Sequence, residues 1–387
     1  MKDRLVSIDA LRGADMLWII GGEGVVLAFC RWMGWADDCW LARQMVHASW
    51  HGREFCQYDT IFPLFLFLAG VSWPFSLAGQ RKRGRTTAQI LGRIGFRVVA
   101  LFVLGIFMAN LFAFRFETVR FNSVLFHIGF CWAVAAVLYM FAGRFWVRMA
   151  VAAALLAGHW LLLVSFRAPD AAALLASADP DVMRRVASYA AWGTDNFSFT
   201  GNLAGWVDRT FLPGWFYEGV FDPDGLLGKM TGVVTAVMGT APGDLLRRTD
   251  LSGNRKALCL MAGAAVMCGL ALAWRPWCPI NKKIWTSTFV LATGAYSLFM
   301  LSVFYWVIDV RGWRKWAFFF QVIGMNAITI FVGKRFLGFG RISEFFLSGV
   351  ASLGNAGFRD LVLSLGTIAV EWLFLYYLYR RKLFLRV

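Results

Sequence analysis

Charged residues are scarce in this 387-residue chain, at 16%, while hydrophobic residues reach 59% and the mean hydropathy is +0.59. Soluble domains carry more charge, so the composition excludes a soluble globular class. No segment alternates apolar and polar residues with period two, which excludes a membrane β-barrel. Tandem repeats are also absent. We therefore predict an all-α integral membrane protein, with residues 1–387 forming one domain.

Apolar segments of about 20 residues, the length that crosses a bilayer as a helix, recur along the chain. They predict a polytopic helix bundle of about ten transmembrane helices, with eleven as the upper count. No basic region with a small-residue cleavage site precedes the first segment, so we expect it to be retained. The segments lie at 14–30, 60–79, 90–112, 122–142, 147–166, 226–242, 257–274, 285–308, 317–337 and 361–379.

Lys and Arg outnumber Asp and Glu by 39 to 23, and they collect in alternate loops, as the positive-inside rule requires. This pattern places both termini in the cytoplasm, with 338–360 and an insertion at 168–225 on the other side. The alanine-rich part of the insertion, 168–193, predicts a short helix outside the bilayer. Because the basic residues follow the topology, anionic membrane lipid is the expected partner and nucleic acid is not. The basic loops are 81–85, 144–148, 247–256, 311–315 and 380–382.

The seven cysteines show no metal-binding spacing. Cys131, Cys259 and Cys268 fall inside predicted spans, where cysteine behaves as a small apolar side chain. Cys39 and Cys56 share the predicted outer loop at 31–58 and are a candidate disulfide pair, which sequence alone does not establish.

Four ionisable residues, His47, His51, Glu54 and Asp59, stand directly before the predicted span at 60–79. Ionisable groups at a membrane entrance are costly and usually mark a pathway or a site. Histidine is the side chain best able to accept and return a proton near neutral pH. The cluster is therefore the first candidate site.

Three interpretations of this cluster remain open from spacing alone. In the structural one, His47 and His51 lie in a wet loop and Asp59 caps a helix N-terminus. In the metal one, the His-x-x-x-His spacing puts both rings on one helical face, although the glutamate of the zincin motif is missing. In the catalytic one, a histidine is the nucleophile or general base and Asp59 orients it.

Six blocks of the sequence resemble the heparan-α-glucosaminide N-acetyltransferase family, in its bacterial branch. They occur in the family's order and run across nearly the whole chain. The blocks are "RLVSIDALRGADMLWIIGGEG" at 4–24, "HASWHGREFCQYDTIFPLFLFLAGVSWPFS" at 47–76, "SVLFHIGFCW" at 123–132, "YEGVFDPDGLLG" at 217–228, "PINKKIWTSTFVL" at 279–291 and "GMNAITIFV" at 324–332.

The resemblance implies a multi-pass acetyltransferase of a bacterial inner membrane. Acetyl-CoA would bind from the cytoplasm, and its acetyl group would reach the amine of a glucosamine-type sugar on the far side. A homodimer is an open possibility. His47 occupies the position of the family's active histidine and Asp59 that of the aspartate before its Phe-Pro pair. The sequence departs from the family where His51 replaces an Asn, His127 an Arg, and Glu23 stands near a missing Asn.

From this resemblance we expect His47 either to form an acetyl-imidazole or to take the proton of the attacking amine, with Asp59 fixing its tautomer. His51 would replace the family's Asn as a hydrogen-bond donor or share in the proton transfer. No metal is expected. The candidate partners of the CoA phosphates are basic residues whose alternative role is ordinary positive-inside charge. They are Arg12, Arg93 and Arg97.

The outer segment at 201–225 offers the side chains that an amino-sugar site needs, aromatic rings for stacking and carboxylates for a protonated amine. An interfacial aromatic belt with helix caps is the alternative interpretation. The candidate sugar-binding residues are Glu23, Trp206, Asp208, Glu218, Asp222 and Asn281, together with Trp215, Tyr217 and Asp224. Lys282 and Lys283 either line the site or anchor a helix end.

A different class of function, an amino-sugar transporter, also fits a polytopic bundle with charged mouths. Transporters usually carry polar groups near the midplane and internal repeats. No repeat is visible here, but Glu23, Asn110, Asn326 and Glu371 inside the spans leave a polar midplane open. An acyltransferase acting on a cell-envelope polysaccharide is a third possibility.

Overall fold

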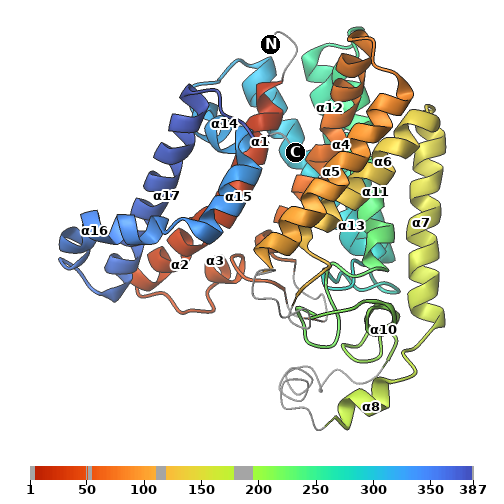
Figure 1. Ribbon diagram of the computed structural model, residues 1–387, viewed down its shortest axis with the longest axis horizontal. Coiled ribbons are helices and arrows are strands. Elements are labelled where there is room, and N and C mark those ends of the chain that lie inside the picture. The colour runs from red at the N-terminus through yellow and green to blue at the C-terminus, as the bar shows by residue number, and fades with distance from the viewer. Residues whose placement is uncertain (1–4, 49, 51–54, 110–118, 178–194, 386–387) are drawn as a thin grey trace.

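The computed structural model describes residues 5–48, 50, 55–109, 119–177 and 195–385. Within this part of the chain the structure is helical, with two isolated β-bridges and no sheet. The all-α prediction is therefore confirmed. The long helices stand side by side in a bundle, and the short helices α8 (Ala171–Leu175) and α10 (Leu203–Phe211) lie at one end of it (Figure 1).

Eight of the described helical segments are long and apolar enough to cross a membrane. A ninth candidate is the pair α14 (Ala317–Met325) and α15 (Ala327–Phe336), which is bent by 71° at the break between them. The eight are Val6–Trp32 (α1 Val6–Leu17, η1 Trp18–Gly22, α2 Glu23–Trp32), α4 Gln57–Lys82, α5 Thr87–Met108, α6 Val124–Phe141, α7 Phe145–Ser165, α12 Gly253–Trp274, Ser287–Val310 (α13 Ser287–Phe304, η5 Tyr305–Val310) and α17 Ala356–Arg380.

The helix α11 (Gly228–Arg247) accounts for the difference from the ten predicted spans. It covers the predicted segment at 226–242, but it is not apolar enough to be counted with the eight. Most of its residues are buried because α4, α6, α7 and α13 pack around it. Its polar side chains bond to neighbouring segments, as Thr231 does by donating at 2.7 Å to the carbonyl oxygen of Trp285, in the turn before α13. An enclosed helix of this kind needs no apolar surface.

Small residues let two helix pairs approach backbone to backbone. A Cβ added to Gly70 of α4 would lie 2.1 Å from the carbonyl oxygen of Ala236 in α11, and one added to Gly239 would lie 2.2 Å from the Phe67 carbonyl oxygen. A Cβ added to Gly13 of α1 would lie 1.8 Å from the carbonyl oxygen of Phe320 in α14. A methyl group does not fit at any of these crossings, so the glycines let α4 pack closely on α11 and α1 on α14.

One predicted boundary is wrong. The first span begins at Val6 and not at 14, because α1 carries Asp9 and Arg12 into the bundle as a 3.5 Å ion pair. The predicted connection at 338–360 contains a further helix, α16 (Phe339–Ala351). The alanine-rich insertion does form a short helix, α8, and its remainder at 178–194 lies outside the described residues.

The basic turns after α4 and α6 lie at one end of the bundle, opposite α8 and α10 (Figure 1). This arrangement agrees with the assignment of the two turns to one side of the membrane and of 168–225 to the other. The prediction that the basic end faces the cytoplasm stays a prediction. Below, the two ends are called the basic end and the insertion end.

Candidate functional site

A cavity of about 420 Å³ opens at the insertion end of the bundle, where α4 begins. We call it the histidine cavity because His47 forms part of its wall. Its other polar lining comes from segments far apart in the chain: the start of α4, the residues before α6 and α11, and the loop before α13. The polar lining residues are His47, Tyr58, Asp59, Arg120, Tyr217, Glu218, Asp224, Asn281, Lys282 and Lys283.

His47 and Asp59 are in direct contact in this cavity. His47 Nδ1 lies 2.8 Å from Asp59 Oδ1, and Asp59 Oδ2 accepts a 2.9 Å bond from the backbone N–H of Ala48. The Asp59 side chain is 3% exposed, whereas the His47 side chain is 46% exposed. A carboxylate on Nδ1 fixes the ring and leaves Nε2 for chemistry, the arrangement of a histidine base and its orienting group.

Lys282, in the loop before α13, competes with Asp59 for Nδ1 of His47. Its Nζ lies 3.0 Å from His47 Nδ1 and 3.4 Å from Asp59 Oδ1. Nδ1 carries either a hydrogen or a lone pair, so it bonds to Asp59 or to the lysine but not to both. Burial lowers the pKa of Lys282, and the nearby Asp59 carboxylate offsets part of that effect. The Lys282 ammonium therefore influences which ring nitrogen of His47 carries the proton.

Tyr58 completes the wall around the imidazole. Its ring packs against His47 with centroids 4.9 Å apart, and its side chain interacts with Glu23 at the start of α2. The predicted role of Glu23 as a direct sugar partner stays a prediction, since the structure places it beside Tyr58 and not in the cavity lining. Tyr58 therefore packs against the His47 ring, and Glu23 contacts Tyr58 from the side of α2.

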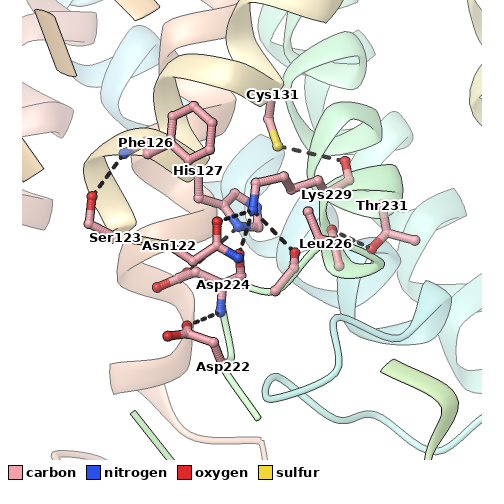
Figure 2. A network of polar contacts seen from close by, with 12 residues as sticks. Asn122, Ser123, Phe126, His127, Cys131, Asp222, Asp224, Leu226, Lys229 and Thr231 are labelled. Atoms are coloured by element: carbon pink, nitrogen blue, oxygen red, sulfur yellow. Dashed lines mark hydrogen bonds and ion pairs between the residues drawn. The ribbon is translucent and has the colours of Figure 1, made fainter. Parts of the chain in front are cut away.

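A buried charge network around Asp224 and Lys229 (Figure 2) contributes Arg120 and Asp224 to the cavity lining. Arg120 holds Asp222 with two 2.6 Å bonds and Asp224 with a third of the same length. Lys229 Nζ donates to Asn122 Oδ1 at 2.8 Å and to the Asp224 carbonyl oxygen at 2.7 Å. Removing one partner of such a buried pair typically costs about 3–5 kcal/mol. The network thus fixes the loop that carries Glu218 into the cavity.

Burial raises the pKa of Asp224 to about 6, although Arg120 works against the rise. Burial likewise raises the pKa of Asp208 to about 7. The two Asp208 oxygens accept the backbone N–H groups of Leu226 at 2.9 Å and Asp222 at 3.2 Å. Asp208 therefore shapes the backbone of the loop between α10 and α11.

The predicted sugar residues separate into two groups in the structure. Glu218 and Asn281 line the histidine cavity, whereas Trp206, Asp208 and Asp222 do not. Glu218 pairs with Lys283 at 2.9 Å, and Asn281 Nδ2 donates to the Trp50 carbonyl oxygen at 2.6 Å. Trp206 packs in a small apolar cluster around Trp50 and Phe221.

Trp285 is a wall residue that the sequence did not single out. It has a φ of 47°, a backbone conformation that large side chains rarely adopt. Its buried ring stacks on His127 with centroids 4.8 Å apart, and Phe62 packs edge-on against it at 5.2 Å. Nδ1 of His127 lies 3.7 Å from Asp224 Oδ1, so this buried histidine packs behind two residues of the cavity lining, Trp285 and Asp224.

A second cavity, of about 820 Å³, opens at the basic end between α4, α5 and α6. We call it the arginine cavity, since Arg85, Arg93 and Arg97 line it together with Trp73 and Trp132. The Arg97 guanidinium lies over the Trp132 ring, 4.2 Å from its centroid, and its Nε is buried without a hydrogen-bond partner.

Two of the three predicted phosphate ligands, Arg93 and Arg97, therefore share one cavity. Arg12 is not in its lining, and donates instead to Ser72 Oγ at 3.1 Å while it pairs with Asp9. Arginine beside an indole face offers both a phosphate fork and a stacking surface. The arginine cavity thus has the chemistry that a phosphorylated nucleotide needs.

A narrow apolar passage of about 50 Å³ lies between the two cavities. It shares Arg97 with the arginine cavity, and it shares Phe62, Val124 and Phe331 with the histidine cavity. Phe331 comes from α15, which the bend after α14 turns toward the passage. The three cavities are therefore neighbours in the order from Arg97 to His47, as their shared lining residues indicate.

The structure bears differently on the metal interpretation and on the catalytic role predicted for His51. The metal interpretation assumed that His47 lies on a helix, but the chain around it is a non-helical loop. Within the described residues no three His, Cys, Asp or Glu side chains gather as for a metal ion. His51 and Glu54 lie outside the described residues, so the predicted share of His51 in catalysis stays a prediction.

No family model matches the sequence. Two curated proteins named heparan-alpha-glucosaminide N-acetyltransferase align with all of it, that of Homo sapiens at 26% identity over 434 residues and that of Mus musculus at 24% over 429 residues. The alignments cover 60% and 61% of those proteins, so the chain spans about three fifths of their length. The chain is thus similar, over its whole length, to heparan-alpha-glucosaminide N-acetyltransferases.

Proposed function

We propose that this protein is a transmembrane acetyltransferase that moves an acetyl group from cytoplasmic acetyl-CoA to the amine of a glucosamine-type sugar on the other side of the membrane. The observation that carries the proposal is the line of cavities from Arg97 to the His47–Asp59 pair. The names of the two relatives supply the reaction. The membrane would be a bacterial inner membrane, with both termini in the cytoplasm.

The three cavities match the three parts of acetyl-CoA. The phosphates and adenine would lie in the arginine cavity, against the guanidinium groups of Arg93 and Arg97 and the indole rings. The long uncharged pantetheine arm would follow the apolar passage. Its thioester would then emerge beside His47. Arg12 belongs to the second layer of this site, because its charge faces that of Arg97.

Catalysis would use Nε2 of His47, since Nδ1 is held by Asp59. In one route, Nε2 attacks the thioester carbonyl carbon, the thiolate of CoA leaves, and the sugar amine then attacks the acetyl-imidazolium. In the other, the amine attacks the thioester directly while Nε2 takes its proton. Asp59 stabilises the imidazolium in both routes. Trapping an acetyl group on His47 after acid quenching would favour the first.

The acceptor amine would lie beside Glu218 and Asn281 in the histidine cavity. Glu218 pairs with Lys283 at 2.9 Å, whereas the other lining carboxylates, Asp59 and Asp224, are engaged by His47 and Arg120. A sugar ammonium can therefore compete with Lys283 for it. The half-exposed ring of Tyr217 offers a stacking face beside them. Within this proposal Asp208 and Asp222 hold the loop, and Trp206 packs beneath it.

The first test uses purified protein in nanodiscs with radiolabelled acetyl-CoA, with and without glucosamine. Formation of labelled N-acetylglucosamine that requires the protein supports the proposal. The bent pair α14–α15, where Asn326 has no side-chain hydrogen bond, favours an amino-sugar transporter as the second candidate. Uptake of labelled glucosamine into proteoliposomes, without turnover of acetyl-CoA, would replace the enzyme by the transporter.

Arg97→Gln is expected to raise the KM for acetyl-CoA by about 10–100-fold, the value of one charge-assisted bond to phosphate. Arg144→Gln is the matched control, because Arg144 is exposed at the same end but outside the arginine cavity. Initial rates at several acetyl-CoA concentrations make the comparison. An unchanged KM in Arg97→Gln would mean that the nucleotide of acetyl-CoA binds elsewhere on the protein.

Lys282→Met is expected to move the acidic limb of the kcat/KM against pH profile upward by about one pH unit. The substitution removes a cation 3.0 Å from His47 Nδ1, so the imidazole becomes protonated more easily and loses its base function at a higher pH. Lys283→Met is the control, since Lys283 pairs with Glu218 instead. If the pH profiles of Lys282→Met and wild type coincide, Lys282 does not influence the protonation of His47.

A further inference from the structure

Two thiols face each other at the insertion end of the bundle, outside the cavities described above. Cys30 lies in the last turn of α2 and is 2% exposed, while Cys39 is the N-cap residue of α3 (Trp40–Arg43) and is partly exposed. Their Sγ atoms are 3.8 Å apart, and both cysteines are free. The sequence suggested Cys56 as the partner of Cys39, whereas the structure brings Cys39 to Cys30.

The backbone between Cys30 and Cys39 forms a tight turn that brings the two thiols close together. The Trp35 N–H donates to the Cys30 carbonyl oxygen and the Cys39 N–H to that of Ala36, both at 2.9 Å. Gly34 has a φ of +69°, which lets the chain turn back after α2. Arg31 also reaches Asp37 within the same turn, at 3.8 Å. Disulfides need an S–S distance of about 2.05 Å, so the thiols must approach by roughly 1.8 Å.

We propose that Cys30 and Cys39 are a redox-active pair that a thiol–disulfide oxidant closes into a disulfide, a modification independent of the proposed acetyl transfer. The partly exposed Cys39 thiolate attacks one sulfur of the oxidant's disulfide, and the first thiol of the oxidant leaves. The buried Cys30 then attacks Cys39 Sγ in this mixed disulfide, and the second thiol leaves. The two cysteines lose two electrons and two protons, and the oxidant gains them as its two thiols.

The pair is connected to the wall of the histidine cavity through α3. Gln44, the residue after α3, accepts the backbone N–H of Gln57 through its side chain and that of Tyr58 through its carbonyl oxygen, both at 3.0 Å. Tyr58 in turn packs against His47. Closing the disulfide anchors α3 to α2 and shortens the free part of the chain that leads to His47. Oxidation therefore restricts the segment that forms this wall.

The test is a redox titration of the full-length protein in detergent with reduced and oxidised glutathione. Free thiols are blocked with N-ethylmaleimide, and tryptic peptides are analysed by mass spectrometry without reduction. Cleavage after the exposed Arg31 separates the cysteines, so the proposal requires two peptides joined through Cys30 and Cys39. It is overturned if both thiols carry N-ethylmaleimide at every glutathione ratio, or if Cys39 carries glutathione while Cys30 remains free.

Cys56→Ser is the matched control, because Cys56 is also buried at the insertion end and precedes α4. This variant is expected to form the same joined peptides at the same glutathione ratio as wild type. Loss of the crosslink in Cys56→Ser would assign the oxidation to Cys56 and overturn the proposal. Hydrogen exchange of residues 40–46 in the oxidised and reduced wild-type protein provides the second measurement. Slower exchange is expected after oxidation, and equal exchange would overturn the link to the cavity wall.

Discussion

Replacing His47 by alanine is expected to lower kcat/KM for acetyl transfer by about 10²–10⁴-fold, the contribution typical of a general base. Alanine removes Nε2, which either attacks the thioester or takes the amine proton. The Kd for CoA should stay close to that of wild type, because the arginine cavity lies at the opposite end of the bundle and shares no lining residue with the histidine cavity. Radiolabelled product formation and CoA titration measure the two quantities on the same preparation.

Two further variants separate the roles within the pair. Asp59→Asn keeps the shape of the carboxylate but lets an amide NH₂ face Nδ1, so the ring can take the wrong tautomer and the rate should fall. His51→Ala measures the part of proton transfer that His51 performs. If His47→Ala retained the wild-type rate, the proposed chemistry at Nε2 would be wrong whatever the other variants did.

The pairing of His47 with Asp59 could be predicted from the sequence because it is local. The two residues are 12 positions apart, and a carboxylate in the first turn of a helix stands near the chain that enters it. Lys282 could be named as a lining residue but not given its contact with Nδ1, since 235 residues separate it from His47. Such a contact depends on how α13 packs against α4, which no local pattern contains.

The acidic residues of the outer segment show a second limit of the sequence. Carboxylates beside aromatic rings predict sugar binding, but the same carboxylates serve when a buried arginine must be neutralised. Arg120 engages both Asp222 and Asp224, and of these two carboxylates only Asp224 lines the cavity. The signal that could have been used is the Asp-Pro-Asp-Gly order at 222–225, because Asp222 accepts the backbone N–H of Asp224 within this turn.

The fold was predictable where helices face lipid and less so where they face each other. The apolar spans appear in the sequence because lipid demands an apolar surface. Helix α11 and the start of α1 carry charges that find partners inside the bundle. Asp244 of α11 accepts a 2.6 Å bond from Arg148 of α7, and Asp9 pairs with Arg12 within α1. Boundaries inferred from hydropathy therefore fail at the centre of the bundle.

Val124→Trp is expected to lower kcat/KM for acetyl transfer by about 10²-fold or more, the effect of displacing a thioester from its reacting geometry. Val124 lines both the apolar passage and the histidine cavity. An indole there fills a passage of only about 50 Å³, so the pantetheine arm could not reach His47. Adenosine 3′,5′-bisphosphate, the nucleotide end of CoA, should still bind in the arginine cavity with wild-type affinity.

Val134→Trp is the matched control for this experiment. Val134 is on the same helix, α6, but its side chain is exposed on the outside of the bundle. Inserting a large side chain into a packed site typically costs about 1–3 kcal/mol, so melting temperatures of both variants must accompany the rates. A folded Val124→Trp protein that transfers acetyl groups as fast as Val134→Trp would mean that the thioester reaches His47 by another route. If Val124→Trp loses acetyl transfer but still binds the nucleotide, the thioester reaches His47 through this passage.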